Sequence, residues 1–376
     1  MTYKRIVYLV LLINLFSCKS QITKEEESPI AKNVILLIGD GTVLSQISSA
    51  FYFKKTRPNY SRFKSIGLIK TSSSREKITD SGAGATAFAS GVKTYNGAIG
   101  VADDSSKVKT LVEIVSPQHI KTGVISTSSI QHATPACFYA HVINRRLYED
   151  ITVDLVESEI DFFAGGGTSF FNKRKDGKDL LEELKKKGFK IDTTGFSDFT
   201  EIKQYSKMAY LLAENHMAPV ANGRGDFLPK ATELGIQFLN KDAENPNFFL
   251  MIEGSQVDWG GHDNDAEYLI SELIDFDDAI GMALDFAEAD GNTLVIVTAD
   301  HETGGFTLSS TLKSVKDSSS YGDYTEITGT FSTKGHSATL IPVFAYGPGA
   351  EAFSGVYENT EIFHKILQAT NWNKKN

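Results

Sequence analysis

The sequence has few of the residues that would constrain the chain covalently. It contains 2 cysteines and 9 prolines among its 376 residues. Cys18 lies in the N-terminal segment, which leaves Cys137 as the single cysteine of the remaining chain. One thiol cannot form an internal disulfide framework. We therefore expect the stability of the protein to come from its core and from bound metals.

The sequence also lacks an excess of positive charge, because its formal net charge is −9. A general nucleic-acid-binding protein would carry a basic surface, so this balance argues against specific nucleic-acid recognition. It does not exclude an anionic substrate, since a local cluster of cations can outweigh the average.

The N-terminus predicts export. Lys4 and Arg5 precede an apolar run, residues 6–16, that is too short to span a bilayer. This pattern predicts a secretory signal peptide over residues 1–17. The segment Leu15-Phe16-Ser17-Cys18 resembles the lipobox of bacterial lipoproteins. That resemblance implies a lipid anchor at Cys18 and a periplasmic or cell-surface bacterial lipoprotein. The alternative is a leader cut elsewhere, with Cys18 incidental.

Five apolar runs of strand length predict a central sheet. They cover Asn33–Ile38, Gly123–Ser126, Phe248–Ile252, Leu294–Thr298 and Ile341–Tyr346. Helical patterns lie between them, such as Asp265–Ala289 before Gly291. Continuous apolar strands that alternate with helices predict an α/β fold, a mostly parallel sheet with helices on both faces. Residues 18–31 are polar and predict a tether. Because no repeat or linker follows, we expect residues 32–376 to form one domain.

Residues with metal-binding or catalytic side chains follow four of these strands. Asp40 follows the first, and His132 and Thr134 follow the second. Glu253, Asp258 and His262 lie at or after the end of the run at 248–252. Asp300 and His301 follow the run at 294–298. Ligands of open α/β sheets bind at the carboxyl ends of the strands, so we expect these side chains to meet.

The composition of this set predicts a metal centre. Mixed aspartate and histidine ligands suit zinc, and oxygen ligands suit magnesium. His336, next to a glycine in GHSA, is a further candidate zinc ligand. The other four histidines have no such neighbours, and we interpret them as structural or surface residues: His119, His141, His216 and His364.

The segment TDSGAGATAFASG, residues 79–91, places Asp80 and Ser81 before a run of small residues. The alanines predict a helix, and the N-terminus of a helix favours an anion. One interpretation is that Ser81 is an ordinary helix cap. The other is that a zinc ion holds Ser81 as an activated nucleophile, and that the small residues let the helix lie against the metals.

These motifs together resemble the alkaline phosphatase family. The matching segments, in family order over about residues 32 to 350, are NVILLIGDG, TDSGAGATAFASGVKTYNGAIGV, HATPACFYAHVINRR, EGSQVDWGGHDND, TADHETGG and GHSATLIPVFAYGPGA. The resemblance implies hydrolysis of small phosphate monoesters at alkaline pH, with two Zn²⁺ and one Mg²⁺ per chain. It also implies a homodimer and a broad substrate range.

The resemblance implies a role for each matching residue. Ser81 would form a phosphoserine intermediate and contact a zinc ion. Asp258, His262 and His336 would bind one zinc ion. Asp40, Asp300 and His301 would bind the other. Asp40 would also reach the magnesium site, with Thr134 and Glu253 as its other ligands. Arg145 would grip two phosphate oxygens and Asp80 would hold that arginine; Arg146 is the alternative to Arg145.

Two residues and one segment depart from the family pattern. His132 stands where the best-known enterobacterial member has an aspartate, and Trp259 stands where that enzyme has a lysine. We expect these two residues to affect the third metal site and phosphate release; the alternative for Trp259 is simple packing. The stretch from Gly305 to Gly335 is short, which implies a reduced crown insertion and puts dimerisation in doubt.

Two rival functions fit parts of the same pattern. A phosphodiesterase or sulfatase shares the bimetallic core, but Ser81, Thr134 and Glu253 favour monoesters, and no sulfatase motif is present. A catalytically dead lipoprotein that binds phosphorylated nutrients would have lost some of these residues, whereas this chain retains them all.

Overall fold

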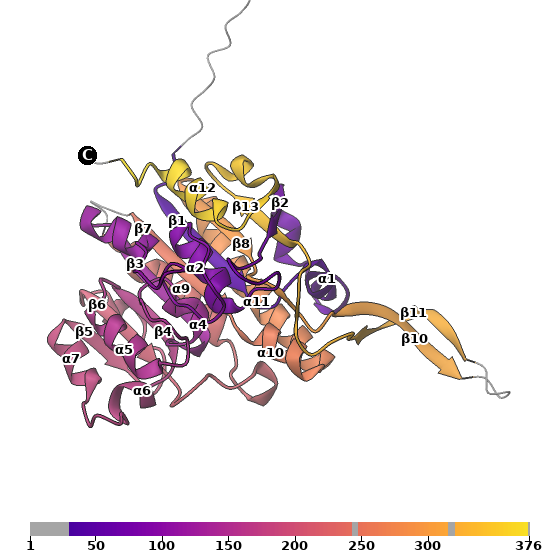
Figure 1. The fold of residues 1–376 in the computed structure, drawn as a ribbon, viewed down its shortest axis with the longest axis horizontal. Helices are drawn as coiled ribbons and strands as arrows, with labels where there is room; N and C mark the ends of the chain where they lie inside the picture. Colours follow the sequence, from indigo (N-terminus) through magenta and orange to yellow (C-terminus); the bar gives the residue numbers. More distant parts are fainter. Residues whose placement is uncertain (1–29, 243–246, 315–319, 375–376) are drawn as a thin grey trace, which may run out of the picture.

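The computed structural model describes residues 30–242, 247–314 and 320–374. The predicted signal peptide and most of the predicted tether lie outside the described residues. Figure 1 shows a layered α/β body from which one β-hairpin projects. Within the described residues, no helix has the length and apolar character needed to cross a bilayer.

A ten-stranded mixed sheet forms the centre of the body, in the order β14-β2-β13-β8-β1-β7-β3-β4-β6-β5. All its neighbouring strands are parallel except β13, which runs antiparallel to both β8 and β2. The strands are β1 Asn33–Gly39, β2 Ser65–Lys70, β3 Lys121–Ser129, β4 Phe162–Gly166, β5 Phe189–Asp192, β6 Lys207–Leu211, β7 Phe248–Gly254, β8 Thr293–Thr298, β13 Ile341–Tyr346 and β14 Gly355–Glu358. The predicted α/β fold with a mostly parallel sheet is confirmed.

Helices cover both faces of this sheet. The α-helices are α1 Leu44–Phe53, α2 Ser81–Ser90, α3 Leu111–Val115, α4 Ala133–Ala136, α5 Tyr148–Glu157, α6 Ser169–Asn172, α7 Leu180–Lys186, α8 Phe199–Ile202, α9 Phe227–Leu239, α10 Gln256–Asp263, α11 Ala266–Asp290 and α12 Glu361–Thr370. The predicted helix before Gly291 is α11, which Asp265 caps and Gly291 ends with a φ of 71°.

Alternate side chains of the central strand β1 enter two different hydrophobic cores, one on each face of the sheet. Val34, Leu36 and Ile38 pack into the core under α2, α3, α5 and α12. Ile35 and Leu37 pack into the other core, with α9 and α11. Successive side chains of a strand point to opposite faces, so a strand covered on both sides is apolar throughout.

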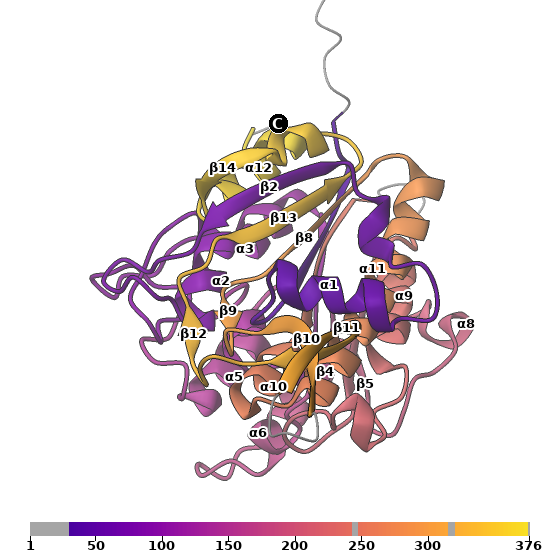
Figure 2. The same cartoon turned by 90° about the vertical axis from the view of Figure 1, so that its right-hand side faces the viewer.

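The projecting hairpin consists of β10 Thr307–Ser314 and β11 Ser320–Thr330, which pair antiparallel. Figure 2 shows it emerging beside α1. It occupies the short stretch where the sequence indicates a reduced crown. Two-residue strands at its base, β9 Glu302–Thr303 and β12 His336–Ser337, pair with each other and bring His336 to the sheet edge.

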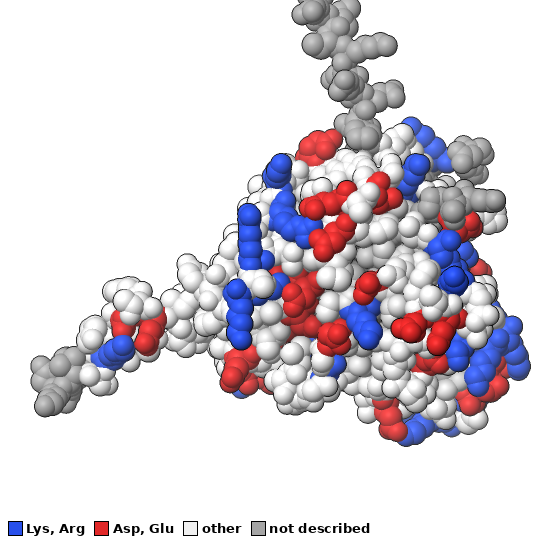
Figure 3. All heavy atoms as spheres, turned by 180° about the vertical axis from the view of Figure 1, so that it is seen from behind, with Lys and Arg blue, Asp and Glu red and all other residues white. Residues whose placement is uncertain are grey.

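On the face shown in Figure 3, basic and acidic side chains are interspersed.

Candidate active site

The ends of three adjacent strands place carboxylates at one edge of the sheet. β1 lies between β7 and β8, and Ile38 pairs with both Glu253 and Thr298. Asp40 and Asp300 therefore follow neighbouring strand ends, beside Glu253 in β7. All three side chains are fully buried. The strands deliver these acids to one place, as the sequence predicted.

Ser81 is the first residue of α2, and Asp80 is the N-cap. The Asp80 carboxylate accepts hydrogen bonds from the backbone N–H groups of Ala83 and Gly97, both at 3.0 Å. The interpretation of Ser81 as the cap is therefore wrong. Its Oγ instead lies 3.4 Å from Asp40 Oδ2 and 3.4 Å from His301 Nε2.

The small residues of α2 allow it to lie against the acidic edge of the sheet. A Cβ added at Gly84 would lie only 2.9 Å from Cβ of Asp300. A Cβ added at Gly82 would lie 2.8 Å from the carbonyl oxygen of Ala98. Larger side chains here would push the helix, and Ser81 with it, away from the carboxylates.

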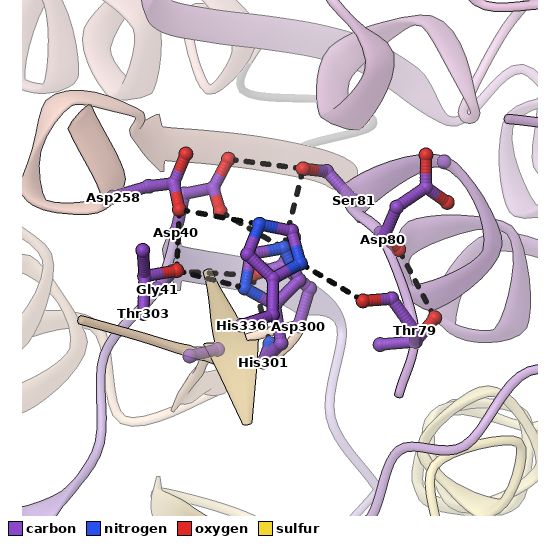
Figure 4. Close-up of polar contacts among 12 residues, drawn as sticks. Asp40, Gly41, Thr79, Asp80, Ser81, Asp258, Asp300, His301, Thr303 and His336 are labelled. Carbon is purple, nitrogen blue, oxygen red and sulfur yellow. Dashed lines mark hydrogen bonds and ion pairs between the residues drawn. The ribbon is translucent and has the colours of Figure 1, made fainter. Parts of the chain in front are cut away.

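Among the residues that the structure describes, three groups of side chains could each hold a metal ion. Within each group the candidate ligand atoms lie within 4.8 Å of one another. The groups are Asp40, Asp300 and His301; Asp258, His301 and His336; and Asp40, His132 and Glu253. Figure 4 shows Asp40, Asp258, Asp300, His301 and His336 converging with Ser81. The predicted ligands thus meet at one site.

His262 also belongs to this site. Its Nε2 lies 3.4 Å from Asp258 Oδ1 and 3.1 Å from His336 Nε2. The Nδ1 atoms of both histidines donate to backbone carbonyls, His262 to Lys334 at 2.6 Å and His336 to Thr79 at 2.9 Å. A carbonyl can only accept, so each Nε2 keeps its lone pair for a metal.

The electrostatics of the site favour the binding of cations. Burial, followed by the charges of Asp300 and Asp258, raises the pKa of Asp40 well above its ordinary value. Asp40 Oδ1, Asp300 Oδ2 and Glu253 Oε1 are buried and accept no hydrogen bond. Buried carboxylates without partners are costly unless a cation balances them. The residues present therefore fit divalent metals.

Three further residues, which sequence reasoning missed, hold the ligands in place. Ser126 and Ser255 donate to Glu253 Oε2 at 2.5 and 2.6 Å. Thr303 donates to Asp258, and its Oγ1 lies 3.3 Å from His301 Nδ1. Their only sequence signal is a position within one or two residues of a strand end or of a ligand.

Arg145 provides the cation of the site. Its Nη1 donates to Asp80 Oδ2 at 2.8 Å, and its Nη2 lies 3.5 Å from His132 Nε2. Burial alone would raise the pKa of Asp80, but Arg145 and the backbone N–H donors lower it. Arg146 is exposed, and its backbone N–H donates to Asn144 Oδ1. The geometry favours Arg145 over Arg146.

His132 and Trp259 lie beside a histidine that the sequence did not single out. The ring of His216 is 5.7 Å from that of His132 and 4.9 Å from that of Trp259, in both cases edge to face. His132 and Trp259 are 6.0 Å apart. His216 comes from a loop after β6 and carries no motif, so sequence spacing alone gave no reason to place it here.

The site opens into a cleft of about 590 Å³. Thr79, Asp80, His262 and His336 line it together with residues 76–78. A small phosphorylated molecule in this cleft would therefore lie against Asp80, the residue before Ser81.

Comparisons with known proteins agree with this site. A family model described as alkaline phosphatase matches residues 31–322 and 311–372. Alkaline phosphatase 3 of Bacillus subtilis (strain 168) is 34% identical, over 92% of this chain and 90% of that protein. The alkaline phosphatase of Escherichia coli (strain K12) is 30% identical, over 90% and 86%.

Solved structures give the same result. The structure of alkaline phosphatase from the Antarctic bacterium TAB5 has a TM-score of 0.90 and 64% identity, covering 93% of this chain and 100% of that chain. A variant of that enzyme, in which a histidine is replaced by aspartate, has Mg bound in the M3 site; its TM-score is 0.91, with the same identity and coverage.

Proposed function

The chain belongs to the alkaline phosphatase family and hydrolyses phosphate monoesters, and we propose that it does so through a phosphoserine intermediate at Ser81, with two zinc ions and one magnesium ion. The observation that carries this proposal is the Ser81 hydroxyl at the start of α2, between the side chains of Asp40 and His301. The monoester activity excludes a dead binding protein and disfavours the diesterase and sulfatase alternatives.

The ligand sets follow from the three groups of side chains. Asp258, His262 and His336 would hold one zinc ion. Asp40, Asp300 and His301 would hold the other, next to Ser81. Asp40, Glu253 and the buried Thr134 would hold magnesium. When bound, such ions lower the pKa of a hydroxyl and neutralise charge on phosphate oxygens.

The remaining chemistry belongs to residues of the chain. The Ser81 hydroxyl gives up its proton as its oxygen forms a bond to phosphorus, the bond from phosphorus to the leaving oxygen breaks, and the released alcohol takes up one proton. A water molecule then gives up a proton as it forms the next bond to phosphorus, the bond to Ser81 breaks, the Ser81 oxygen takes up a proton, and phosphate leaves. The free N–H groups at the start of α2 favour the anion throughout.

Arg145 binds and orients the phosphoryl group. A planar guanidinium can donate to two phosphate oxygens at once, and Asp80 fixes its orientation through Nη1. Because charge spreads over these oxygens in the transition state, the contact strengthens as the reaction proceeds.

His132 and Trp259 together set the magnesium preference of the third metal site and the release of phosphate. The Mg-bound variant of the TAB5 enzyme has an aspartate in place of a histidine, and His132 lies with Asp40 and Glu253 in the third group. An added carboxylate is a harder ligand, so His132→Asp should raise the magnesium preference.

Trp259→Lys should tighten phosphate inhibition and lower kcat. The measurement is the phosphate inhibition constant, with metal content unchanged. An equal constant would leave Trp259 only a packing role.

Acid-quench labelling tests the intermediate. The wild-type chain, mixed with a phosphate-labelled monoester and quenched in acid, should carry label on Ser81. Ser81→Ala should carry none and lose several orders of magnitude in kcat. Ser90→Ala, at the other end of α2, is the matched control and should behave as wild type. Normal turnover without label on Ser81 would instead indicate direct attack by water.

We also propose that the chain forms a homodimer through the β10–β11 hairpin. An isolated two-stranded hairpin is marginally stable in water. This one exposes Leu312, Tyr321 and Tyr324, the last with 89% of its surface accessible. Light scattering should give the mass of a dimer for the wild type and of a monomer for Leu312→Lys/Tyr324→Lys. A wild-type monomer at every concentration would contradict the proposal.

Finally, we propose export as a bacterial lipoprotein anchored at Cys18, on the basis of the lipobox-like segment. Cys18→Ala should release the protein from the membrane fraction or block processing of the leader. A mature N-terminus without lipid, cut at another residue, would contradict the anchor.

A further inference from the structure

The third metal site has a neighbour outside the known ligand pattern. His132, His216 and Trp259 form three mutually edge-to-face rings, which we call the aromatic triad. Their separations fall in the range where aromatic rings attract one another. His132 and Trp259 come from the active-site segments, whereas His216 reaches them from residues 212–226, the loop between β6 and α9.

The ring of His216 is fixed by a hydrogen bond as well as by its neighbours. The backbone N–H of Ser129 donates to His216 Nδ1 at 3.0 Å. Ser129 is the last residue of β3, three positions before His132. Because Nδ1 accepts this bond, the proton of the neutral ring is on Nε2. The bond ties His216 to the strand end that leads to His132 and Thr134.

The loop that carries His216 is held to the body at both sides of this residue. The backbone oxygen of Ala213 accepts from the N–H of Gly167 at 3.0 Å. The backbone oxygen of Met217 accepts from Gln256 Nε2 at 2.8 Å, and Gln256 lies three residues before Trp259. Any Cβ at Gly166 would lie 2.0 Å from the backbone oxygen of Asn215, so the close approach requires glycine there.

A buried charge cluster anchors the far end of the same loop. Arg224, whose side chain is fully buried, donates to Glu272 and, at 2.7 Å, to Asp275. Glu272 also accepts from the backbone N–H of Val220 at 2.8 Å. Both acids belong to α11. The loop is therefore a rigid brace rather than a free surface segment, although His216 itself is exposed.

We propose that His216 is a positioning residue, which the brace formed by residues 212–226 presses against His132 and Trp259 so that the third metal site keeps its geometry. This inference rests on the proposed function, because it requires that a third metal binds beside Asp40, Glu253 and His132. His216 acts through its contacts with His132, Trp259 and Ser129 and is not itself a ligand.

Magnesium binding to the full holoenzyme tests this role independently of activity. In a Trp372→Phe background, Trp259 is the single tryptophan of the chain, and its emission reports on the triad as magnesium is titrated into the zinc-loaded protein. His216→Ala should weaken magnesium binding about tenfold, as loss of a residue that supports a metal ligand does. Zinc content should stay unchanged.

Two conservative variants separate positioning from other roles. His216→Asn keeps an acceptor for the N–H of Ser129, and His216→Phe keeps a ring against His132 and Trp259. Each should recover part of the magnesium affinity lost in His216→Ala. His364→Ala, which removes an exposed histidine of α12, is the matched control and should bind magnesium as the wild type does.

The outcomes are distinguishable. Equal magnesium affinity in wild type and His216→Ala would overturn the positioning role. Recovery by neither Asn nor Phe would overturn it in favour of a direct imidazole ligand, and loss of zinc along with magnesium would overturn it in favour of general unfolding. A wild-type chain that binds zinc but no magnesium would overturn the proposed third site itself.

Discussion

Among the places where the described residues bury carboxylates, two balance the charge differently. On α11, Glu272 and Asp275 share the buried guanidinium of Arg224. At the edge of the sheet, Asp40, Glu253 and Asp300 are fully buried and leave oxygen atoms without a hydrogen bond. The first region, which we call balanced, gives each acid an ionic partner even though the two acids share one positive charge. The second, which we call unbalanced, leaves carboxylate oxygens without a hydrogen bond.

The difference indicates what each region is for. A buried acid with a matching arginine is complete without any ligand, and it can serve as a structural anchor. Buried acids without a partner are stable only when something else supplies the charge. The unbalanced region is therefore the one that binds metals, and the balanced region holds the loop that lies beside it.

Metal removal should have the largest effect, because the unbalanced region depends on bound cations. Dialysis against a chelator should abolish monoester hydrolysis, and zinc plus magnesium should restore it, because Ser81 then has nothing to activate its hydroxyl. The melting temperature should also fall, since metals that bind only the folded state stabilise it. Full turnover by protein shown to be free of both metals would contradict the assignment of the unbalanced region.

Loss of Arg224, the cation of the balanced region, should have the next largest effect, which is on the stability of the fold. Arg224→Met leaves Glu272 and Asp275 buried without a cation, which should cost about 3–5 kcal/mol in the free energy of unfolding. Urea denaturation measures it. Even beside Arg224, burial raises the pKa of Asp275 to about 6 and that of Glu272 above its ordinary value, so both acids oppose folding once they are charged and lack their cation.

A compensated variant provides the control for this second prediction. Arg224→Met/Glu272→Gln/Asp275→Asn removes all three charges and should recover most of the lost stability. If the single variant is as stable as the wild type, the cluster is no anchor, and the contrast between the two regions disappears.

Arg145 is the arginine that the described residues place at the unbalanced region, and its substitution tests that contact. Arg145→Ala should lower kcat/KM by roughly ten- to hundredfold, the value of a charged hydrogen bond of ~1.5–3 kcal/mol, and should weaken phosphate inhibition. Metal content should not change. Arg146→Ala is the matched control and should behave as wild type. The opposite ranking of the two variants would assign phosphate binding to the neighbouring arginine.

A half-exposed pair should give the smallest effect. His141 Nε2 lies 3.1 Å from Glu113 Oε1, whose side chain is 44% exposed. Burial alone would lower the pKa of His141, but its hydrogen bond with Glu113 raises it above 6.5. A raised histidine pKa stabilises the fold below pH 6.5, and this contribution is lost as the pH rises through the folded-state pKa.

Glu113→Gln measures this contribution. The variant keeps the capping box of α3, since glutamine can replace glutamate there. At about pH 6 its free energy of unfolding should be lower than that of the wild type by about 1 kcal/mol or less. The two free energies should converge at alkaline pH. A difference that does not change with pH would mean that His141 is neutral in the folded protein.

Much of the fold and site could be predicted because the signals are local. The runs that became β1, β7, β8 and β13 are apolar on both faces, and their ends lie within a residue or two of the predicted bounds. Short edge strands such as β5, with partly exposed side chains, carry no such run. The hairpin is likewise exposed over most of its length and gives only a weak pattern.

By itself, the sequence determined the α/β alternation and the acids and histidines at the strand ends, because these depend on spacing along the chain. Only the tertiary structure decided that Asp80 rather than Ser81 caps α2, that Thr303 supports Asp258, and that the ring of His216 lies against those of His132 and Trp259. Ser129 and His216 are 87 positions apart. No local pattern encodes such a contact, since it follows from how strands and loops pack once the whole sheet has formed.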